Sequence, residues 1–388
     1  MLVKQRYRPL MWSKTFLGVV SVLYRNVLKP VFFKMDPETA HHWTIGGLSS
    51  IGNIPGGMGL LDMMYGVQEA PELSMDLWGI RFPHPIGLAA GLDKNGQAVR
   101  AFSSIGFGFI EVGTVTPKAQ PGNELPRLFR LPQDEALINR MGFNNLGAEY
   151  LAKQLVGIQK LKQKRIPIAI NIGKNKLTSN EAAMDDYMAC IRILYPYGDF
   201  FVVNISSPNT PDLRKLQHGD ELRQLLHAVT QEMDVQKEKY QRALPILVKI
   251  APDLGDEELE QVVETLSASR ISGIIATNTT LSRDGLTHQN ARETGGMSGK
   301  PLAKRSTEVI HSIYKLTGGR MPIIGVGGVF TAEDAYEKIR AGASLVEIYT
   351  ALIYKGPGVI QEITNGLSQL LRKDGLTHIS EAVGIDVI

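Results

Sequence analysis

The chain has 388 residues, enough for two or three domains of about 150 residues or for one α/β barrel with insertions. Hydrophobic residues make up 43% and charged residues 21%, a composition that is typical of globular proteins and excludes a disordered or collagen-like chain. The single cysteine, Cys190, excludes an internal disulfide and multi-cysteine iron–sulfur sites, and we expect no metal centre. The net charge of +3 is too small to indicate a nucleic-acid partner.

Positive charge is concentrated at the N-terminus. Residues 1–35 contain seven Lys or Arg and no acidic residue, which leaves 35 basic against 39 acidic residues in the rest of the chain. The longest charge-free run there, residues 15–24, has ten residues, far short of the roughly 20 that span a bilayer. We therefore expect residues 1–72 to form amphipathic helices of a peripheral membrane protein, on the cytoplasmic face of the cell membrane. A signal or transit peptide, or a helix docked only on the protein body, is the alternative.

Residues 73–388 contain short apolar runs separated by helical patterns. Residues 73–78 and 81–85, on either side of Gly79, predict a small hairpin. Eight compact apolar runs follow, at residues 85–91, 107–115, 167–173, 200–206, 245–251, 273–279, 321–329 and 344–350. Most of these runs are continuous rather than alternating, as parallel strands covered on both faces require.

Helical patterns fill the intervals, at residues 147–164, 181–195, 220–238, 256–269, 302–316 and 332–340. This alternation predicts an α/β fold, a (β/α)8 TIM barrel, in which residues 73–388 form one domain preceded by the N-terminal helical extension. A doubly wound sheet is the alternative. The long connections 116–166 and 280–320 are expected to carry insertions over one mouth of the barrel.

The predicted strands end in polar or glycine-rich residues, where barrel enzymes place their active sites. In chain order these residues are Ala90 to Lys94, Gly113-Thr114, Asn171, Asn204 to Asn209, Lys249, Thr277 to Thr279, Gly327-Gly328 and Tyr349-Thr350. A single Asn or Thr at a strand end is more often a turn residue than part of a site. Eight polar ends in succession indicate a ring of hydrogen-bonding groups around one cavity.

Six motifs in this order resemble those of class 2, membrane-associated, quinone-dependent dihydroorotate dehydrogenases. They are MDPETAH at residues 35–41, LAAGLDK at 88–94, NRMGFN at 139–144, NISSPN at 204–209, GGMSG at 295–299 and GVGGV at 325–329. The resemblance extends over residues 24–356. It implies oxidation of (S)-dihydroorotate to orotate, the fourth step of pyrimidine (UMP) biosynthesis, with FMN as hydride acceptor and a membrane quinone as final electron acceptor.

A flavin phosphate has a predicted position in the barrel. Gly328 after the seventh strand, Gly299 before it and Tyr349-Thr350 after the eighth match the phosphate site that barrels form between these loops. Lys249 at a strand end would stabilise negative charge on a reduced flavin. The resemblance adds to the FMN site the residues Ala90, Gly91, Leu92, Asp93, Lys94, Thr114, Asn171, Asn204 and Thr277.

Dihydroorotate is a small ring with a carboxylate, so its site needs a cation and several amides. Lys94 is the expected carboxylate partner. The amides expected to bind the N–H and C=O groups of the ring are those of Asn139, Asn204, Asn209 and Asn278. The expected substrate site is completed by Thr279 and by the backbone of the segment Arg140, Met141, Gly142 and Phe143.

Ser207 is the predicted catalytic base, since the resemblance places it where soluble class 1 relatives have cysteine. A serine hydroxyl is a poor base at neutral pH and needs a polarising partner, for which Thr210 is a candidate. His41 matches a quinone-site position of the family. Arg130 is expected either to hydrogen-bond the quinone or to pair with an acid on the loop surface.

Three other functions are possible from the residues alone. A class 1 enzyme that uses fumarate or NAD is disfavoured by Ser207 and by the apolar N-terminal extension. A phosphate-binding barrel lyase or aldolase remains open through Lys249 as a Schiff-base lysine. A non-catalytic membrane adaptor would explain only residues 1–50. The oligomeric state is not indicated.

Overall fold

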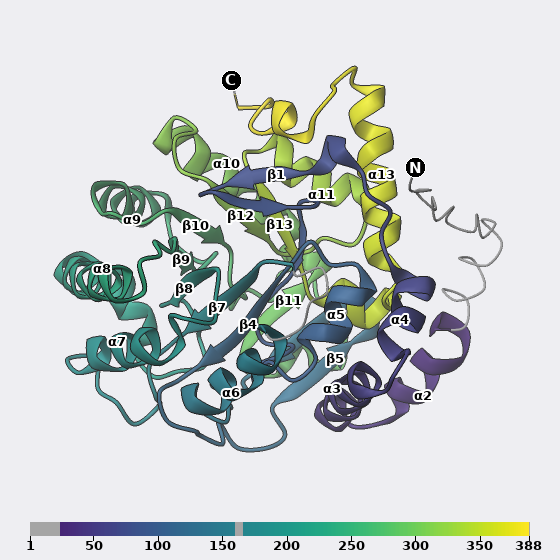
Figure 1. Ribbon diagram of the computed structural model, residues 1–388, viewed down its shortest axis with the longest axis horizontal. Coiled ribbons are helices and arrows are strands. Elements are labelled where there is room, and N and C mark those ends of the chain that lie inside the picture. The colour runs from purple at the N-terminus through teal and green to yellow at the C-terminus, as the bar shows by residue number, and fades with distance from the viewer. Residues whose placement is uncertain (1–23, 160–165, 388) are drawn as a thin grey trace, which may run out of the picture.

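Eight parallel strands form a closed barrel in the computed structural model, which describes residues 24–159 and 166–387 (Figure 1). The strands follow one another around the barrel in chain order, and the last pairs with the first. They are β3 (Ile86–Leu88), β4 (Phe109–Val115), β7 (Ile168–Ile172), β8 (Phe200–Asn204), β9 (Ile246–Ile250), β10 (Gly273–Ala276), β12 (Ile323–Val326) and β13 (Leu345–Ile348). Each lies within one of the eight predicted runs, so the barrel prediction is confirmed.

Helices surround the barrel, as the patterns between the strands predict (Figure 1). The six that were predicted are α6 (Ala148–Gln159), α7 (Ala183–Leu194), α8 (Gly219–Tyr240), α9 (Asp256–Ala268), α10 (Ala303–Thr317) and α11 (Ala332–Arg340). Residues 160–164 of the first predicted helix lie outside the described residues. The structure adds α5 (Val99–Ile105), α12 (Thr350–Lys355) and α13 (Val359–Lys373), which the sequence analysis did not identify.

The predicted hairpin, β1 (Met75–Leu77) and β2 (Ile80–Phe82), closes the N-terminal mouth of the barrel with aromatic side chains. The ring of Phe82 contacts Phe109 edge-on at 5.4 Å between centroids and Phe200 at 6.2 Å. A Cβ on Gly87 would lie 2.3 Å from the ring of Phe109, so only glycine fits beside it. This mouth is filled with side chains, and the opposite mouth is left for a site.

The two long insertions come together in one antiparallel sheet, which their sequences did not predict. β5 (Leu128–Leu131) and β6 (Ala136–Asn139) form a hairpin in the first insertion, and β11 (Gly296–Gly299) of the second pairs with β6. Glycine at position 299 has φ +108° and a Cβ there would lie 2.4 Å from the carbonyl oxygen of Glu135. The sheet has its own small core of Leu131, Ala136, Ile138 and Met297.

The N-terminal extension is helical from Tyr24 onward, as expected. It consists of a π-helical turn η1 (Tyr24–Leu28), then α2 (Lys29–Lys34), α3 (Pro37–Asn53) and α4 (Gly57–Tyr65). α3 and α4 pack on α5, and α3 also contacts β5 of the insertion sheet (Figure 1). Among the described residues, no helix is both long and apolar enough to cross a membrane. The expectation for the charge-free run 15–24 falls almost wholly outside the described residues.

A buried ion pair joins this extension to the insertion sheet. Glu38, on the first turn of α3, accepts hydrogen bonds from both Nε (2.9 Å) and Nη2 (2.7 Å) of Arg127. Burial alone would raise the pKa of Glu38, but the hydrogen bonds and positive charge of Arg127 outweigh it and lower the pKa. Only 7% of the Glu38 side chain and 10% of Arg127 are exposed, so neither charge is solvated if the other is removed.

Arg127→Met is therefore expected to lower the free energy of unfolding by about 3 kcal/mol, because it leaves the carboxylate of Glu38 buried and unpaired. Urea denaturation measures the loss, and limited proteolysis should show faster cleavage within α3. The control is Arg25→Ala, which breaks an exposed pair with Glu362, about 45% exposed on each side, and should cost less than about 1 kcal/mol. Equal losses in the two variants would contradict this role of the Arg127 pair.

Candidate active site

A cavity of about 1020 Å³, including its open entrance, lies at the C-terminal mouth of the barrel. Residues from all the strand ends except that of β7 line it, together with the insertion sheet. The predicted site residues that line it are Ala90, Gly91, Lys94, Thr114, Asn139, Met141, Gly142, Phe143, Asn204, Ser207, Asn209, Lys249, Thr277, Asn278, Thr279, Gly299, Gly328, Tyr349 and Thr350. The structure thus brings residues from positions 90 to 350 around one space.

Four of the residues predicted for the FMN and substrate sites do not line this cavity: Leu92, Asp93, Arg140 and Asn171. The Asp93 carboxylate accepts hydrogen bonds from the backbone N–H of Gln97 and of Ala98, both at 2.8 Å, and so holds the turn that leads into α5. Burial outweighs these bonds and raises the pKa of Asp93 to about 6. The side chain of Arg140 instead pairs with Glu293 at 2.6 Å. The Asp93 side chain thus holds a turn, and the Arg140 side chain, of which only the backbone was expected at the site, pairs with an acid.

The cavity floor is a buried charged network. The Nζ of Lys249 lies 2.7 Å from Oε2 of Glu111 inside the barrel. The Nδ2 of Asn171 donates to the other oxygen of Glu111 at 2.6 Å, and the backbone N–H of Ala90 donates to Oε2 at 2.9 Å. Burial alone would lower the pKa of Lys249, but the negative charge of Glu111 outweighs it and keeps the ammonium protonated. Asn171 therefore acts from behind the cavity wall, by orienting Glu111.

Ser207 lies on the loop after β8 and is buried. Its Oγ accepts a hydrogen bond from the backbone N–H of Asn209 at 3.2 Å. The side-chain Nδ2 of Asn209 donates to the backbone carbonyl of Asn139 at 3.0 Å. Thr210 is buried on the same loop, and its role as a polarising partner stays a prediction. Cys190 lies in α7, away from the cavity lining, and burial raises the pKa of its thiol.

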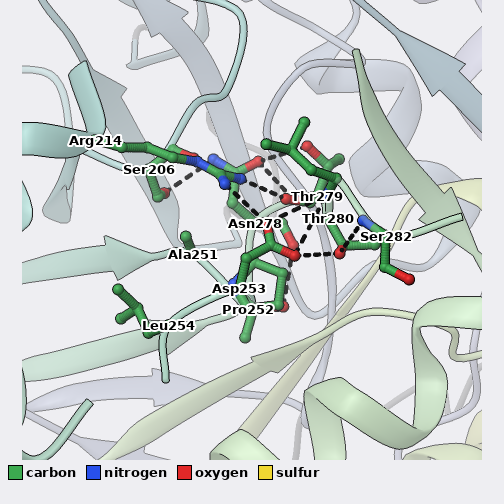
Figure 2. Close-up of polar contacts among 12 residues, drawn as sticks. Ser206, Arg214, Ala251, Pro252, Asp253, Leu254, Asn278, Thr279, Thr280 and Ser282 are labelled. Carbon is green, nitrogen blue, oxygen red and sulfur yellow. Dashed lines mark hydrogen bonds and ion pairs between the residues drawn. The ribbon is translucent and has the colours of Figure 1, made fainter. Parts of the chain in front are cut away.

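An ion pair ties the Ser207 loop to the next two strand-end loops, as Figure 2 shows. Arg214 donates from Nε to the carbonyl of Ser206 at 3.1 Å and from Nη2 to the carbonyl of Thr279 at 3.0 Å. Its Nη1 lies 2.8 Å from Oδ2 of Asp253, whose Oδ1 accepts the hydroxyl of Thr280. The carbonyls of residues 206 and 279 are adjacent in sequence to Ser207 and Asn278, so Arg214 fixes the spacing between the two sides of the site.

Lys94 is half-buried on the cavity wall, where its Nζ donates to Oδ1 of Asn144 and lies 3.4 Å from Sδ of Met141. Burial lowers the pKa of Lys94 to about 7, an effect that the negative charge of Glu38 partly opposes. A Lys that loses its proton near neutral pH is stabilised in its charged form by an anionic ligand. This position suits a carboxylate-binding cation.

Glycines shape the opposite wall, after β12. Gly327 and Gly328 have φ values of +131° and +72°, and a Cβ on Gly328 would lie 2.6 Å from the backbone nitrogen of Ala303 at the start of α10. Only glycine allows this close approach. Beside it, the hydroxyls of Ser298 and Thr350 lie 2.9 Å apart. The wall therefore presents backbone and hydroxyl groups at the place where barrels bind phosphate.

Residues 72–371 match the protein family described as dihydroorotate dehydrogenase. The chain belongs to the dihydroorotate dehydrogenase family. It is an oxidoreductase, as members of this family are. The dihydroorotate dehydrogenase (quinone) of Deinococcus deserti is 53% identical over 365 residues, which cover 94% of this chain and 100% of that protein. The dihydroorotate dehydrogenase (quinone) of Idiomarina loihiensis is 51% identical over 343 residues, which cover 88% of this chain and 99% of that protein.

A solved structure agrees with the family assignment. The crystal structure of DHODH from Eimeria tenella in complex with ferulenol is similar to this chain, with a TM-score of 0.82 and 37% sequence identity. The alignment covers 95% of this chain and 98% of the Eimeria chain.

The two residues expected to bind quinone, His41 on α3 and Arg130 on β5, do not line the main cavity. His41, on α3, is half-buried, and burial, then the positive charges of Lys94 and His42, lower its pKa to about 3. Arg130 donates to the carbonyl of Met35 at 2.8 Å and lies over the ring of Phe33 at 4.9 Å. Within the described residues Arg130 forms no ion pair, and both expectations for Arg130 stay predictions.

Several residues in and behind the cavity were not predicted from the sequence. Glu347, which lines the cavity, and Glu111, which lies behind the wall, are acids inside apolar strands, LVEI and FIEVGTV. A charged residue in a strand covered on both faces is a signal in itself, because an unpaired charge there is costly. The other unpredicted lining residues are Ala89, Ser298, Leu302, Val326, Val329, Phe330, Ile348 and Ala351.

Proposed function

We propose that the chain oxidises dihydroorotate to orotate in pyrimidine biosynthesis, with FMN as cofactor and a membrane quinone as final electron acceptor. The observation that carries this proposal is the convergence of Lys94, Ser207 and Asn278 on one cavity whose floor holds the cation of Lys249. A carboxylate-binding cation, a proton acceptor and amides are what oxidation of this substrate requires. The curated relatives in Deinococcus and Idiomarina are named for the same reaction.

The cavity residues fit FMN. Gly327, Gly328 and Thr350 line the cavity at the position where barrels bind phosphate, and the Lys249 ammonium would be available to negative charge on a reduced ring. When it is bound, FMN supplies a hydride acceptor. We assign to FMN the wall formed by Ala90, Gly91, Thr114, Thr277, Gly299 and Tyr349, with Asn171 acting through Glu111.

The residues around the substrate would each have a separate role in binding or proton transfer. Lys94 holds the carboxylate, and Asn139, Asn209 and Asn278 hold the ring by its N–H and C=O groups. Ser207 then accepts the proton from C5 of dihydroorotate, while Arg214 keeps the Ser207 loop in place through the Ser206 carbonyl.

Quinone access is proposed at the N-terminal helices, because their outer surface is unusually apolar. Seven of the fifteen exposed large hydrophobic side chains of the described residues belong to residues 24–65. They are Val27, Leu28, Val31, Trp43, Ile54, Leu60 and Met63, 41% to 69% exposed. An apolar surface of this kind, with nearby Lys and Arg, suits the interface of an anionic membrane. His41 is close enough to Lys94 of the cavity wall for that charge to lower its pKa, so a quinone head beside His41 would be near the cavity.

The central test is anaerobic reduction of bound flavin by dihydroorotate in a stopped-flow instrument. Ser207→Ala should bind FMN and orotate as the wild type does but reduce its flavin about 10² to 10⁴ times more slowly, the usual effect of a positioned base. Ser207→Cys should recover part of the rate at high pH, where thiolate forms. Unchanged reduction in the alanine variant would remove Ser207 from the mechanism, and a folded protein that does not bind FMN would contradict the proposal as a whole.

The pKa of Lys94 predicts how orotate binding depends on pH. Because that pKa is about 7 in the free protein and the carboxylate requires charged Lys94, binding above pH 7 must take up a proton. The Kd of orotate should therefore rise with pH, by up to about tenfold per unit, until the pKa of the complex is reached. Calorimetry in buffers of different ionisation enthalpy measures both Kd and proton uptake. Lys94→Met should bind weakly with little pH dependence, and a wild-type Kd that is constant from about pH 6 to pH 9 would refute the assignment.

The membrane role is tested on the full chain by making the apolar surface polar. Val31, Trp43 and Leu60 are 58%, 69% and 50% exposed, so the triple serine variant should fold normally. Its partition onto anionic liposomes should fall by about 100-fold, at about 1 kcal/mol per side chain. Turnover with a long-tailed quinone should fall with it, while flavin reduction by dihydroorotate is unchanged. The matched control is Val235→Ser, 59% exposed on α8, and equal losses in the control would exclude a localised membrane surface.

A further inference from the structure

Glu347 is a buried carboxyl group that the proposed reaction does not use. It lies in β13, is 1% exposed and lines the main cavity. Both of its carboxyl oxygens are buried and neither accepts a hydrogen bond from a protein donor, which is true of no other carboxyl group in the part of the chain that the structure describes. A buried polar group without a partner costs about 1 to 3 kcal/mol, so its presence at a functional cavity requires an explanation.

The charged groups that face Glu347 come from two other strands. Lys249 on β9 has its Nζ 3.6 Å from Oε2 of Glu347. The second group is Glu111 on β4, whose carboxyl group lies within hydrogen-bonding reach of that of Glu347 when one of the two is protonated. On the neighbouring strands Glu347 lies opposite Gly87 and Val326, which do not titrate. Two carboxyl groups therefore face one ammonium group in the barrel interior.

Of the two carboxyl groups, that of Glu111 interacts more strongly with the ammonium group of Lys249. It lies 2.7 Å from Lys249 and also accepts hydrogen bonds from the Ala90 N–H and the Asn171 amide. The charge of Lys249 and these bonds outweigh burial and lower the pKa of Glu111. Burial, and then the negative charge of Glu111, raise the pKa of Glu347 well above its usual range. A second carboxylate would leave the cluster with an uncompensated negative charge in a dry interior.

We propose that Glu347 is a neutral carboxylic acid at working pH and donates a hydrogen bond into the cavity, to an acceptor atom of the bound cofactor. The Lys249–Glu111 pair is then neutral overall, and the cavity floor offers two donors, an ammonium and a carboxylic O–H. Only the identity of the occupant, FMN, rests on the proposed function. The protonation of Glu347 follows from its surroundings in the barrel.

The protonated group can be observed directly in the full chain as purified. The infrared difference spectrum between wild type and Glu347→Gln should contain the C=O stretch of a protonated carboxylic acid at neutral pH. That band should shift when FMN binds, because the O–H then gains an acceptor atom of the cofactor. A carboxylate signal in place of this band at neutral pH would overturn the proposal.

Unfolding provides a second measurement that does not require a cofactor. The pKa of Glu347 is raised in the folded state. As the pH rises above the pKa that Glu347 has in the unfolded chain, the wild type therefore becomes progressively less stable. The unfolding constant of the wild type, divided by that of Glu347→Gln, should rise by up to about tenfold per pH unit until the folded pKa is reached. Glu264→Gln makes the same change on the exposed face of α9 and should show no such rise. A flat ratio for Glu347→Gln would overturn the proposal.

FMN affinity then separates the donor role from protonation alone. Glu347→Gln keeps a neutral donor, so its FMN affinity should match that of the wild type near neutral pH and stay constant at alkaline pH, where the wild type weakens. Glu347→Leu removes the donor and should bind FMN about tenfold more weakly. Equal FMN affinity in all three proteins would exclude the hydrogen bond. Failure of every protein to bind FMN, with the infrared band present, would instead contradict the proposed function and leave the protonated Glu347 in place.

Discussion

The ion pair between Lys249 and Glu111 is the interaction on which the rest of the site depends. A charge inside a closed barrel is stable only if its partner and its remaining hydrogen bonds are all supplied by the protein. Here the partners come from three different strands and from the backbone of Ala90, so pairing the charges also fixes the relative positions of those strand ends. The same geometry keeps an ammonium group available at the cavity floor without exposing it to water.

The two mouths of the barrel carry opposite chemistry. Aromatic side chains around Phe82 fill the N-terminal mouth, while the strand ends at the other mouth carry amides, hydroxyls and glycines. Packing can therefore determine the stability of one end while the other end is shaped for binding. The insertion sheet and the Arg214–Asp253 pair hold the loops over that second mouth, which a barrel of strands and helices alone would leave unconstrained.

The sequence could predict the eight strands because each is a continuous apolar run, and it could predict the cavity residues because strand ends converge in any barrel. It could not predict the pairing of β6 with β11, since alternation within a strand does not identify a partner about 160 residues away. It also assigned Asp93 to the cofactor by its motif, whereas backbone N–H groups occupy that carboxylate. Glu347 is hard to identify from the sequence, because the apolar run around it predicts a core strand.

Glu38 connects the N-terminal helices to the chemistry of the barrel. Its carboxylate is fixed by Arg127, yet its charge also raises the pKa of Lys94 and that of His41 above what burial alone would give. Lys94 in turn lowers the pKa of His41, so the proposed substrate cation and the proposed quinone residue respond to each other's charge. The helical extension is thus electrostatically coupled to the cavity. It supplies one of the charges that set how tightly the cavity can hold an anion, and a change in the docking of α3 would alter substrate binding and quinone access together.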